Sequence, residues 1–400
     1  MNETDKFAPR SLPTRDALFI GAARYRRPSY TSNHPLAIPR VSLALDLINA
    51  YGAITPAEYL TGRKASNKEL TWFHEPAYIQ AFQRAQFRGK VTQADRERFQ
   101  LGNLENPYFP DFFDTPSLAT GSSIQGAEQV LAGRTAFSPA GGMHHAAPHQ
   151  ARGFCYLNDP ALAIMRLRRA GLRVLYLDID AHHGDGVEAA FVDDPETLTA
   201  SIHMDTSYAY PFQGGGIDDQ PGGAVNLPLP PGINDAEYRL AFHSLWSRLL
   251  EGFRPDVVVL QAGTDILTHD PLSKFRVSNG VFWEAATRVI DESPRLLVLG
   301  GGGYHPIALA RCWTGVWARL TGRALDERLP DAASALLRAV NWELDDEDAE
   351  ETERLYTHLS DLPNDGPVRE EVRARVQRLL DSHPLLAPRV MAVRQIESKD

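Results

Sequence analysis

The chain has 400 residues, 43% of them hydrophobic and 23% charged, and a formal net charge of −10. This composition is that of an ordinary globular protein, and the negative charge disfavours a nucleic-acid binder, which usually carries a basic face. The two cysteines, Cys155 and Cys312, are too few for a disulfide framework and predict a cytoplasmic protein. No apolar run is long enough to span a membrane, and the first residues lack the apolar core of a secretory signal.

Short apolar runs rich in β-branched residues predict buried strands at 173–179, 197–203, 256–261 and 295–300. Their apolar residues are nearly continuous, which is typical of parallel strands covered on both faces. Segments with helical spacing lie before three of them, at 160–171, 234–253 and 280–292. Asn234 or Asp235 is the expected N-cap of the second helix, and Gly252 is expected to help end it. This alternation predicts an α/β fold with a parallel sheet.

The segment LYLDIDAHHGDGVEAAF, residues 175–191, combines metal-ligand and proton-transfer residues without any Lys or Arg. Residues two apart in an extended segment point the same way, so Asp180 and His182 face one direction. With Asp265, which follows another predicted strand, they would give a metal three protein ligands and an open fourth position, as in catalytic zinc sites. Carboxylates that only cap helices are the alternative. That alternative suits a single Asp better than the whole segment, because buried carboxylates without partners are costly.

A second cluster, AGGMHHAAPHQARGFCYLND at residues 140–159, contains the paired histidines His144 and His145. A metal alone does not cleave an amide, because a proton must leave the water and another must reach the leaving amine. The two imidazoles could divide this work if carboxylates oriented them, and Asp178 and Asp185 are available. Two core histidines satisfied by backbone carbonyls are the alternative, which fits either histidine alone better than the pair.

A third element, LVLGGGGYHP, places four glycines and Tyr304 directly after a predicted strand. The glycines allow the backbone to pass close to a ligand, and the tyrosine hydroxyl could stabilise an oxyanion at the metal site. A phosphate-binding loop is the competing interpretation, but the run lacks the Gly-Lys-Ser/Thr ending and the G-x-G-x-x-G spacing. Ligands of open parallel sheets sit beyond the carboxyl ends of the strands. The segments that carry Asp180 and His182, Asp265, and Tyr304 each follow a predicted strand, so they are expected to build one site.

These motifs, in this order, resemble those of the histone deacetylase family. The likeness runs from about residue 33 to residue 320 and is closest to the class I branch and to the bacterial acetoin-utilisation deacetylases. It implies an arginase-like three-layer α/β fold with a central, mostly parallel sheet of about eight strands. From about residue 326 the sequence instead predicts charged amphipathic helices. We therefore expect a catalytic domain at 15–324 and a helical extension at 325–400, packed on it or appended to it.

The resemblance also implies roles for single residues. The ligands of zinc (Zn²⁺), or of ferrous iron (Fe²⁺), which accepts the same set, would be Asp180, His182 and Asp265. The proton-transfer residues with their carboxylate partners would be His145 with Asp185 and His144 with Asp178. Tyr304 would polarise the acetyl carbonyl. A potassium ion (K⁺) is expected near Asp178, Asp180, His182, Ser201 and Ile202.

A narrow tunnel for acetyl-lysine is implied as well. The expected substrate-binding residues are Phe154 and Tyr210 as walls, Gly153, Gly302, Leu272 near the rim, Glu105 at the rim, and Arg40 in an exit channel for acetate. Two positions depart from the family pattern. Glu105 stands where the family often has an Asp that clamps the substrate backbone. The segment TSYAYPFQGGG around Tyr210 lacks the usual Phe-Pro-Gly-Thr-Gly.

The resulting hypothesis is a zinc-dependent amidohydrolase that removes acetyl groups from lysine side chains of proteins. Metal-activated water would attack the amide, with a His general base and a Tyr that stabilises the oxyanion. Its partner would be an acetylated protein or peptide, with no direct nucleic-acid or membrane partner. The alternatives are a deacetylase of small amines such as acetylpolyamines, a non-catalytic acyl-lysine reader, and an arginase-like manganese enzyme. The last would need further Asp and His ligands to hold two metals.

Overall fold

The structure, a computed structural model, describes residues 15–27, 30, 34–341 and 349–387. Parts of the predicted extension, 342–348 and 388–400, lie outside the described residues. A single parallel sheet of eight strands runs in the order β2-β1-β3-β8-β7-β4-β5-β6. The strands are β1 (Ala17–Gly21), β2 (Tyr59–Thr61), β3 (Thr135–Ser138), β4 (Val174–Asp178), β5 (Thr197–Met204), β6 (Val225–Leu229), β7 (Val257–Gln261) and β8 (Leu296–Leu299). The predicted arginase-like, parallel architecture and all four predicted strands are confirmed.

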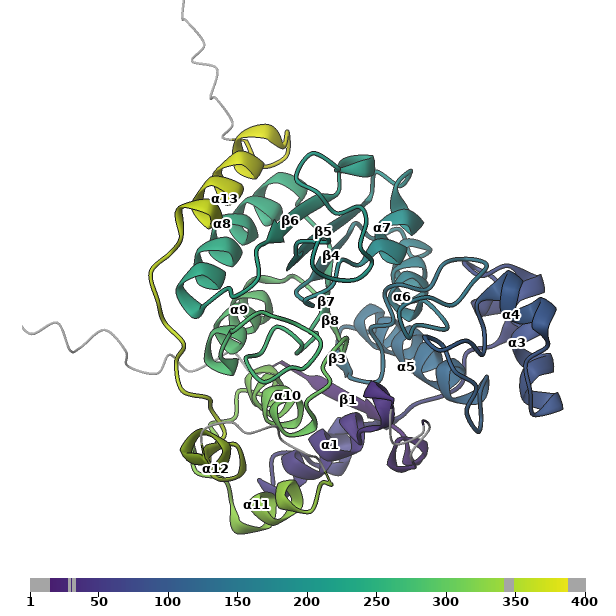
Figure 1. The fold of residues 1–400 in the computed structure, drawn as a ribbon, viewed down its shortest axis with the longest axis horizontal. Coiled ribbons are helices and arrows are strands. Elements are labelled where there is room, and N and C mark those ends of the chain that lie inside the picture. The colour runs from purple at the N-terminus through teal and green to yellow at the C-terminus, as the bar shows by residue number, and fades with distance from the viewer. Residues whose placement is uncertain (1–14, 28–29, 31–33, 342–348, 388–400) are drawn as a thin grey trace, which may run out of the picture.

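Helices cover both faces of the sheet, so that it forms the middle of three layers (Figure 1). One layer contains α5 (Asp114–Leu131), α6 (Asp159–Arg168) and α7 (Asp185–Phe191). The other contains α1 (Arg40–Ala50), α8 (Asp235–Phe253), α9 (Asn279–Glu292) and α10 (Pro306–Leu320). Alternate residues of β4 pack into different layers: Tyr176 contacts the first and Leu177 the second. Burial on both faces explains why these strands are almost continuously apolar.

The predicted helix boundaries hold with small differences. Asn234 caps α8, accepting the backbone N–H of Glu237, whose side chain accepts the backbone N–H of Asn234 in return. Gly252 does not end this helix, which continues to Phe253; Arg254, in the left-handed conformation with φ of 55°, follows it. The first predicted helix ends at Arg168, three residues earlier than expected.

Smaller elements lie at the edge of these layers. The short helices α2 (Asn67–Leu70), α3 (Pro76–Arg88) and α4 (Gln93–Phe99) pack beside α5 around a separate aromatic cluster. In the described part of the chain, no helix is long and apolar enough to cross a membrane.

The C-terminal region lies against the body through three further helices, α11 (Asp331–Arg338), α12 (Ala349–Thr357) and α13 (Glu370–Ser382). Helix α11 packs on α1, whereas α13 packs on α8 and β6. A buried ion pair ties the segment after α12 to α10: Nη1 of Arg311 lies 2.7 Å from Oδ1 of Asp361, and the arginine side chain is fully buried. The Arg311 Nε–H also donates to the carbonyl of His358.

We expect Arg311→Met to lower the free energy of unfolding by about 3–5 kcal/mol, because it leaves the buried Asp361 carboxylate without its cation. Arg338→Met is the matched control. Arg338 pairs with Glu353 at the surface, where both side chains are about half exposed, and such pairs contribute about 0–1 kcal/mol. Urea unfolding followed by circular dichroism compares the two variants. Equal losses would show that the buried pair does not hold this region on the body.

Candidate active site

The candidate metal ligands and Tyr304 follow three strands that are neighbours in the sheet, β8, β7 and β4, whereas His144 and His145 follow β3, the other neighbour of β8. At their carboxyl ends Asp178 lies opposite Gln261, which in turn lies opposite Leu299. The loops that continue from these three residues therefore begin at one edge of the sheet. This register explains why segments far apart in the sequence reach a common site.

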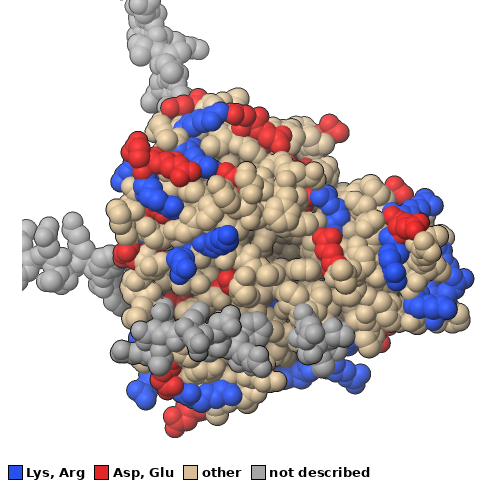
Figure 2. Space-filling view, in the orientation of Figure 1, with Lys and Arg blue, Asp and Glu red and all other residues tan. Residues whose placement is uncertain are grey.

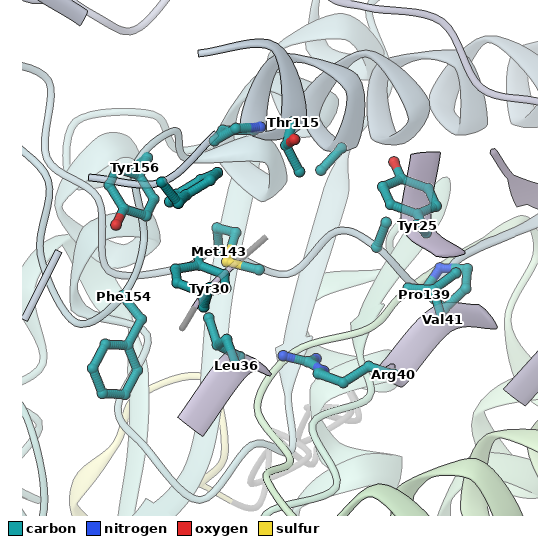
Figure 3. A pocket seen from close by; sticks show the side chains of 14 residues that line it. Tyr25, Tyr30, Leu36, Arg40, Val41, Thr115, Pro139, Met143, Phe154 and Tyr156 are labelled. Atoms are coloured by element: carbon teal, nitrogen blue, oxygen red, sulfur yellow. The ribbon is translucent and has the colours of Figure 1, made fainter. Parts of the chain in front are cut away.

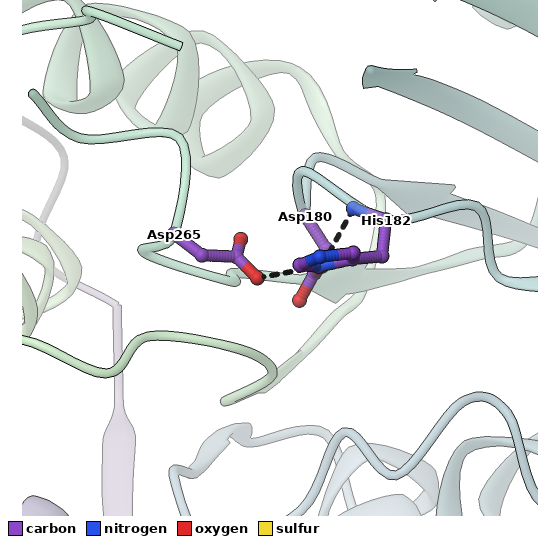
Figure 4. Close-up of side chains that lie close together, drawn as sticks. All are labelled: Asp180, His182 and Asp265. Carbon is purple, nitrogen blue, oxygen red and sulfur yellow. Dashed lines mark hydrogen bonds and ion pairs between the residues drawn. The ribbon is translucent and has the colours of Figure 1, made fainter. Parts of the chain in front are cut away.

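Asp180, His182 and Asp265 form a compact, buried group (Figure 4). Nδ1 of His182 lies 2.9 Å from Oδ2 of Asp265 and 3.2 Å from Oδ1 of Asp180, and one ligand atom from each residue lies within 4.8 Å of the others. Backbone N–H groups orient the carboxylates: that of Ala181 donates to Asp265, and that of Gly302 donates to Asp180. Two carboxylates and one imidazole at this spacing form a candidate metal site with an open coordination position.

The charges in this group also suit a cation. Burial, together with the neighbouring Asp180 carboxylate, raises the pKa of Asp265 to about 6. Burial alone would lower the pKa of His182, but the two carboxylates raise it well above its ordinary value. The protein itself thus brings an excess of negative charge to a buried place, and a divalent cation bound by the three side chains would compensate it.

The glycine run passes directly against these carboxylates. A Cβ on Gly302 would overlap Oδ2 of Asp265, and Gly301 and Gly303 have φ values of 126° and 131°, which other residues rarely adopt. The run therefore serves close approach to the candidate metal ligands. Its Gly302 N–H is directed at the Asp180 carboxylate.

The two histidines lie side by side, each held by its own carboxylate. Nδ1 of His144 lies 2.8 Å from Asp178, Nδ1 of His145 lies 2.8 Å from Asp185, and the two Nε2 atoms are 3.0 Å apart. Burial opposes a charge on His144, but the Asp178 and Asp180 carboxylates raise its pKa to about 9. Burial and the adjacent His144 lower the pKa of His145 to about 3. His145 is therefore the neutral member of the pair.

Three supporting residues were missed by the sequence analysis. Asp159 accepts the backbone N–H groups of Gly142 and Met143, and the Asn158 side chain donates to the carbonyl of Ala146. Together they hold the loop that carries the histidines. The third residue, Arg152, lies 2.9 Å from the Asp185 carboxylate. Asp159 and Asn158 belong to the motif GFCYLND, which was the sequence signal that could have identified them.

Most of the expected substrate-binding residues gather around one pocket. It is lined by His144, His145, Gly153, Phe154, Asp180, Gly302, Tyr304 and Arg40, among others. The Phe154 and Tyr304 rings are 6.1 Å apart, and the Tyr304 backbone N–H donates to Asp270.

The remaining expected residues are not part of this lining. The Tyr210 ring lies 4.7 Å from the His145 ring. Glu105 accepts the backbone N–H of Gly153, and the Leu272 side chain is 38% exposed. Ser201 and Ile202 lie on β5, where Ser201 is opposite Asp178. Potassium binding there stays a prediction.

An apolar cavity of about 120 Å³ adjoins the pocket on the side of α1 (Figure 3). Arg40, Leu36, Met143 and Phe154 line both spaces. The Arg40 guanidinium lies 5.4 Å from the Trp313 ring centre and donates to the carbonyl of Gly301. Arg40 thus lies between the candidate metal site and the cavity, and its role in an exit channel stays a prediction.

Residues 34–320 match the histone deacetylase domain family. The chain belongs to the histone deacetylase family. Histone deacetylase 8 of Xenopus tropicalis is 35% identical over 298 residues, which cover 73% of this chain and 80% of that protein. Histone deacetylase 1 of Homo sapiens is 36% identical over 312 residues, which cover 76% of this chain and 63% of that protein.

Solved structures of histone deacetylase homologues agree with the fold. The crystal structure of an HDAC homolog from Aquifex aeolicus has a TM-score of 0.87 and 41% identity, covering 91% of this chain and all of that one. An HDAC homolog complexed with SAHA has a TM-score of 0.87 and 40% identity, with the same coverage. Membership of the histone deacetylase family supports a deacetylase, and the buried Asp-His-Asp group is its candidate metal centre.

Proposed function

We propose that this chain is a zinc-dependent amidohydrolase that removes acetyl groups from lysine side chains of proteins. The observation that carries the proposal is a pocket lined by Tyr304, by two carboxylate-paired histidines and by Asp180 of the buried Asp-His-Asp group. A non-catalytic reader would need no general base. An arginase-like two-metal enzyme would need more ligands, and in the described part of the chain the Asp-His-Asp triad is the only such group.

Each part of the pocket has a task in amide hydrolysis. Zinc held by Asp180, His182 and Asp265 would polarise the acetyl carbonyl and lower the pKa of the attacking water, and ferrous iron suits the same ligands. His145, neutral and oriented by Asp185, takes the proton of the water at Nε2 and passes a proton to the departing lysine nitrogen.

The tunnel side chains suit the rest of an acetylated lysine. The acetylated side chain is uncharged, so its methylene groups can be buried between the Phe154 and Tyr210 rings without stranding a charge. The Tyr304 hydroxyl donates to the carbonyl oxygen as negative charge develops there. We also propose a cytoplasmic location, since both cysteines are buried free thiols.

Acetate release by zinc-loaded protein tests the proposal, with an acetyl-lysine peptide and an acetylpolyamine as parallel substrates. We expect turnover of the peptide and loss of that turnover in Tyr304→Phe. The polyamine is the second candidate because the negative rim residue Glu105 would attract a cationic amine. Turnover of the polyamine alone would move the function to small amines. Zinc binding without cleavage of either substrate would favour the reader.

A further inference from the structure

Phe212 has an unusual conformation on the loop that carries Tyr210. Its φ is +59°, in the left-handed region that bulky residues rarely adopt, and its side chain is 68% exposed. A left-handed phenylalanine costs free energy, and an exposed ring recovers little of it by burial within the chain. A bulky residue that is exposed in a costly backbone conformation is a candidate for contact with a bound substrate or partner.

Contacts place the Phe212 ring outside the tunnel wall. The Tyr210 ring lies 4.7 Å from the His145 ring, and the Phe212 ring lies 6.1 Å from the Tyr210 ring on the same loop. The Phe212 backbone N–H donates to the carbonyl of Ala209, which fixes the turn. The Phe212 ring therefore contacts Tyr210, and Tyr210 in turn contacts the proposed general base His145.

Two other exposed apolar side chains come from loops that are tied to the same pocket. Leu104, 99% exposed, precedes Glu105, whose carboxylate accepts the backbone N–H of Gly153. Leu272, 38% exposed, donates its backbone N–H to Asp270, which also accepts the Tyr304 backbone N–H.

Single exposed apolar residues are normal on a protein surface, but hydrogen bonds and ring contacts connect the loops of these three to Gly153, Tyr304 and His145, which line one pocket. Figure 2 shows a hollow near the middle of the face in view, with uncharged residues as well as basic and acidic ones around it.

We propose that Phe212, Leu104 and Leu272 form an apolar rim that binds bulky apolar side chains next to the acetylated lysine of a protein substrate. This inference rests on the proposed function and narrows its substrate class. A peptide whose acetyl-lysine enters the tunnel must lay its neighbouring residues across the mouth, where these three side chains are. Contact between them removes apolar surface from water on both partners. Small acetylated amines have no side chains to place there.

Two acetyl-lysine peptides test the rim, one with Leu and Phe beside the acetyl-lysine and one with Gly at both places. We expect the zinc-loaded protein to favour the apolar peptide in kcat/KM by about tenfold. Phe212→Gly should reduce this ratio to about 2, since glycine accepts the left-handed backbone and removes only the ring. Phe212→Leu should keep most of the ratio, and Leu104→Ala should lower it independently.

Phe87→Ala is the matched control, because Phe87 is 93% exposed on α3 and has no place at the rim. The ratio of the kcat/KM values for the two peptides should be the same in this variant as in the unchanged protein. Equal kcat/KM for both peptides would overturn the rim and leave the deacetylase standing. If the protein cleaves neither peptide, both the proposed function and the proposed rim are contradicted. Self-association that Phe212→Gly abolishes without changing the ratio would reassign the surface to contact between two copies of the chain.

Discussion

Tyr304→Phe is expected to lower kcat for acetyl-lysine peptides by about 10²–10³-fold, the usual effect of removing one oxyanion donor. The change removes a single hydroxyl from a ring that is already buried beside Phe154. Two carboxylates in the metal group make it more anionic than a three-histidine set, so the metal should be a milder Lewis acid. The tyrosine must then supply more of the stabilisation of the developing charge.

Steady-state kinetics and a metal titration together isolate this effect. The variant should bind zinc as the unchanged protein does, since Tyr304 is not in the candidate metal group. Tyr51→Phe is the matched control, because its hydroxyl donates to the carbonyl of Asp326 at the surface and should not affect turnover. Near-full activity of Tyr304→Phe would remove the tyrosine from the mechanism.

Asp265→Asn is expected to weaken zinc binding by at least about 100-fold and to abolish turnover. The change removes the charge of one of three ligands, a larger loss than the ten- to hundredfold usual for residues outside the ligand set. Isothermal titration of metal-free protein measures the affinity. The rise in Tm on adding zinc is an independent readout, because a ligand of the folded state stabilises it.

Asp270→Asn is the matched control for this change. Asp270 is also a buried carboxylate near Tyr304 that accepts backbone N–H groups, but it lies outside the metal group. Its variant should keep zinc affinity. Equal loss of affinity in both variants would mean that general charge at this edge, rather than ligation by Asp265, binds the metal.

The sequence pattern of a segment was enough to predict those structural features that depend only on the residues of that segment. The continuous apolar run of β4 predicted a buried parallel strand, because both of its faces are covered. Asp180 and His182, which continue from it, do meet in the metal group as expected, although a bend rather than extended backbone carries them. The strands β1, β2, β3 and β6 were not predicted from their own segments. Of these, β2 has three residues, too few for periodicity to separate it from a loop.

The amino-acid sequence by itself determined the parallel α/β architecture, the order of the motifs and the residue types available for metal binding and proton transfer. Only the tertiary structure decided which partners meet. Arg152 reaches Asp185, Asp159 holds the histidine loop, and Phe212 is exposed in a left-handed conformation. Each of these depends on loops from different strands arriving at one edge of the sheet. Such contacts are set by strand register and packing, which no single segment encodes.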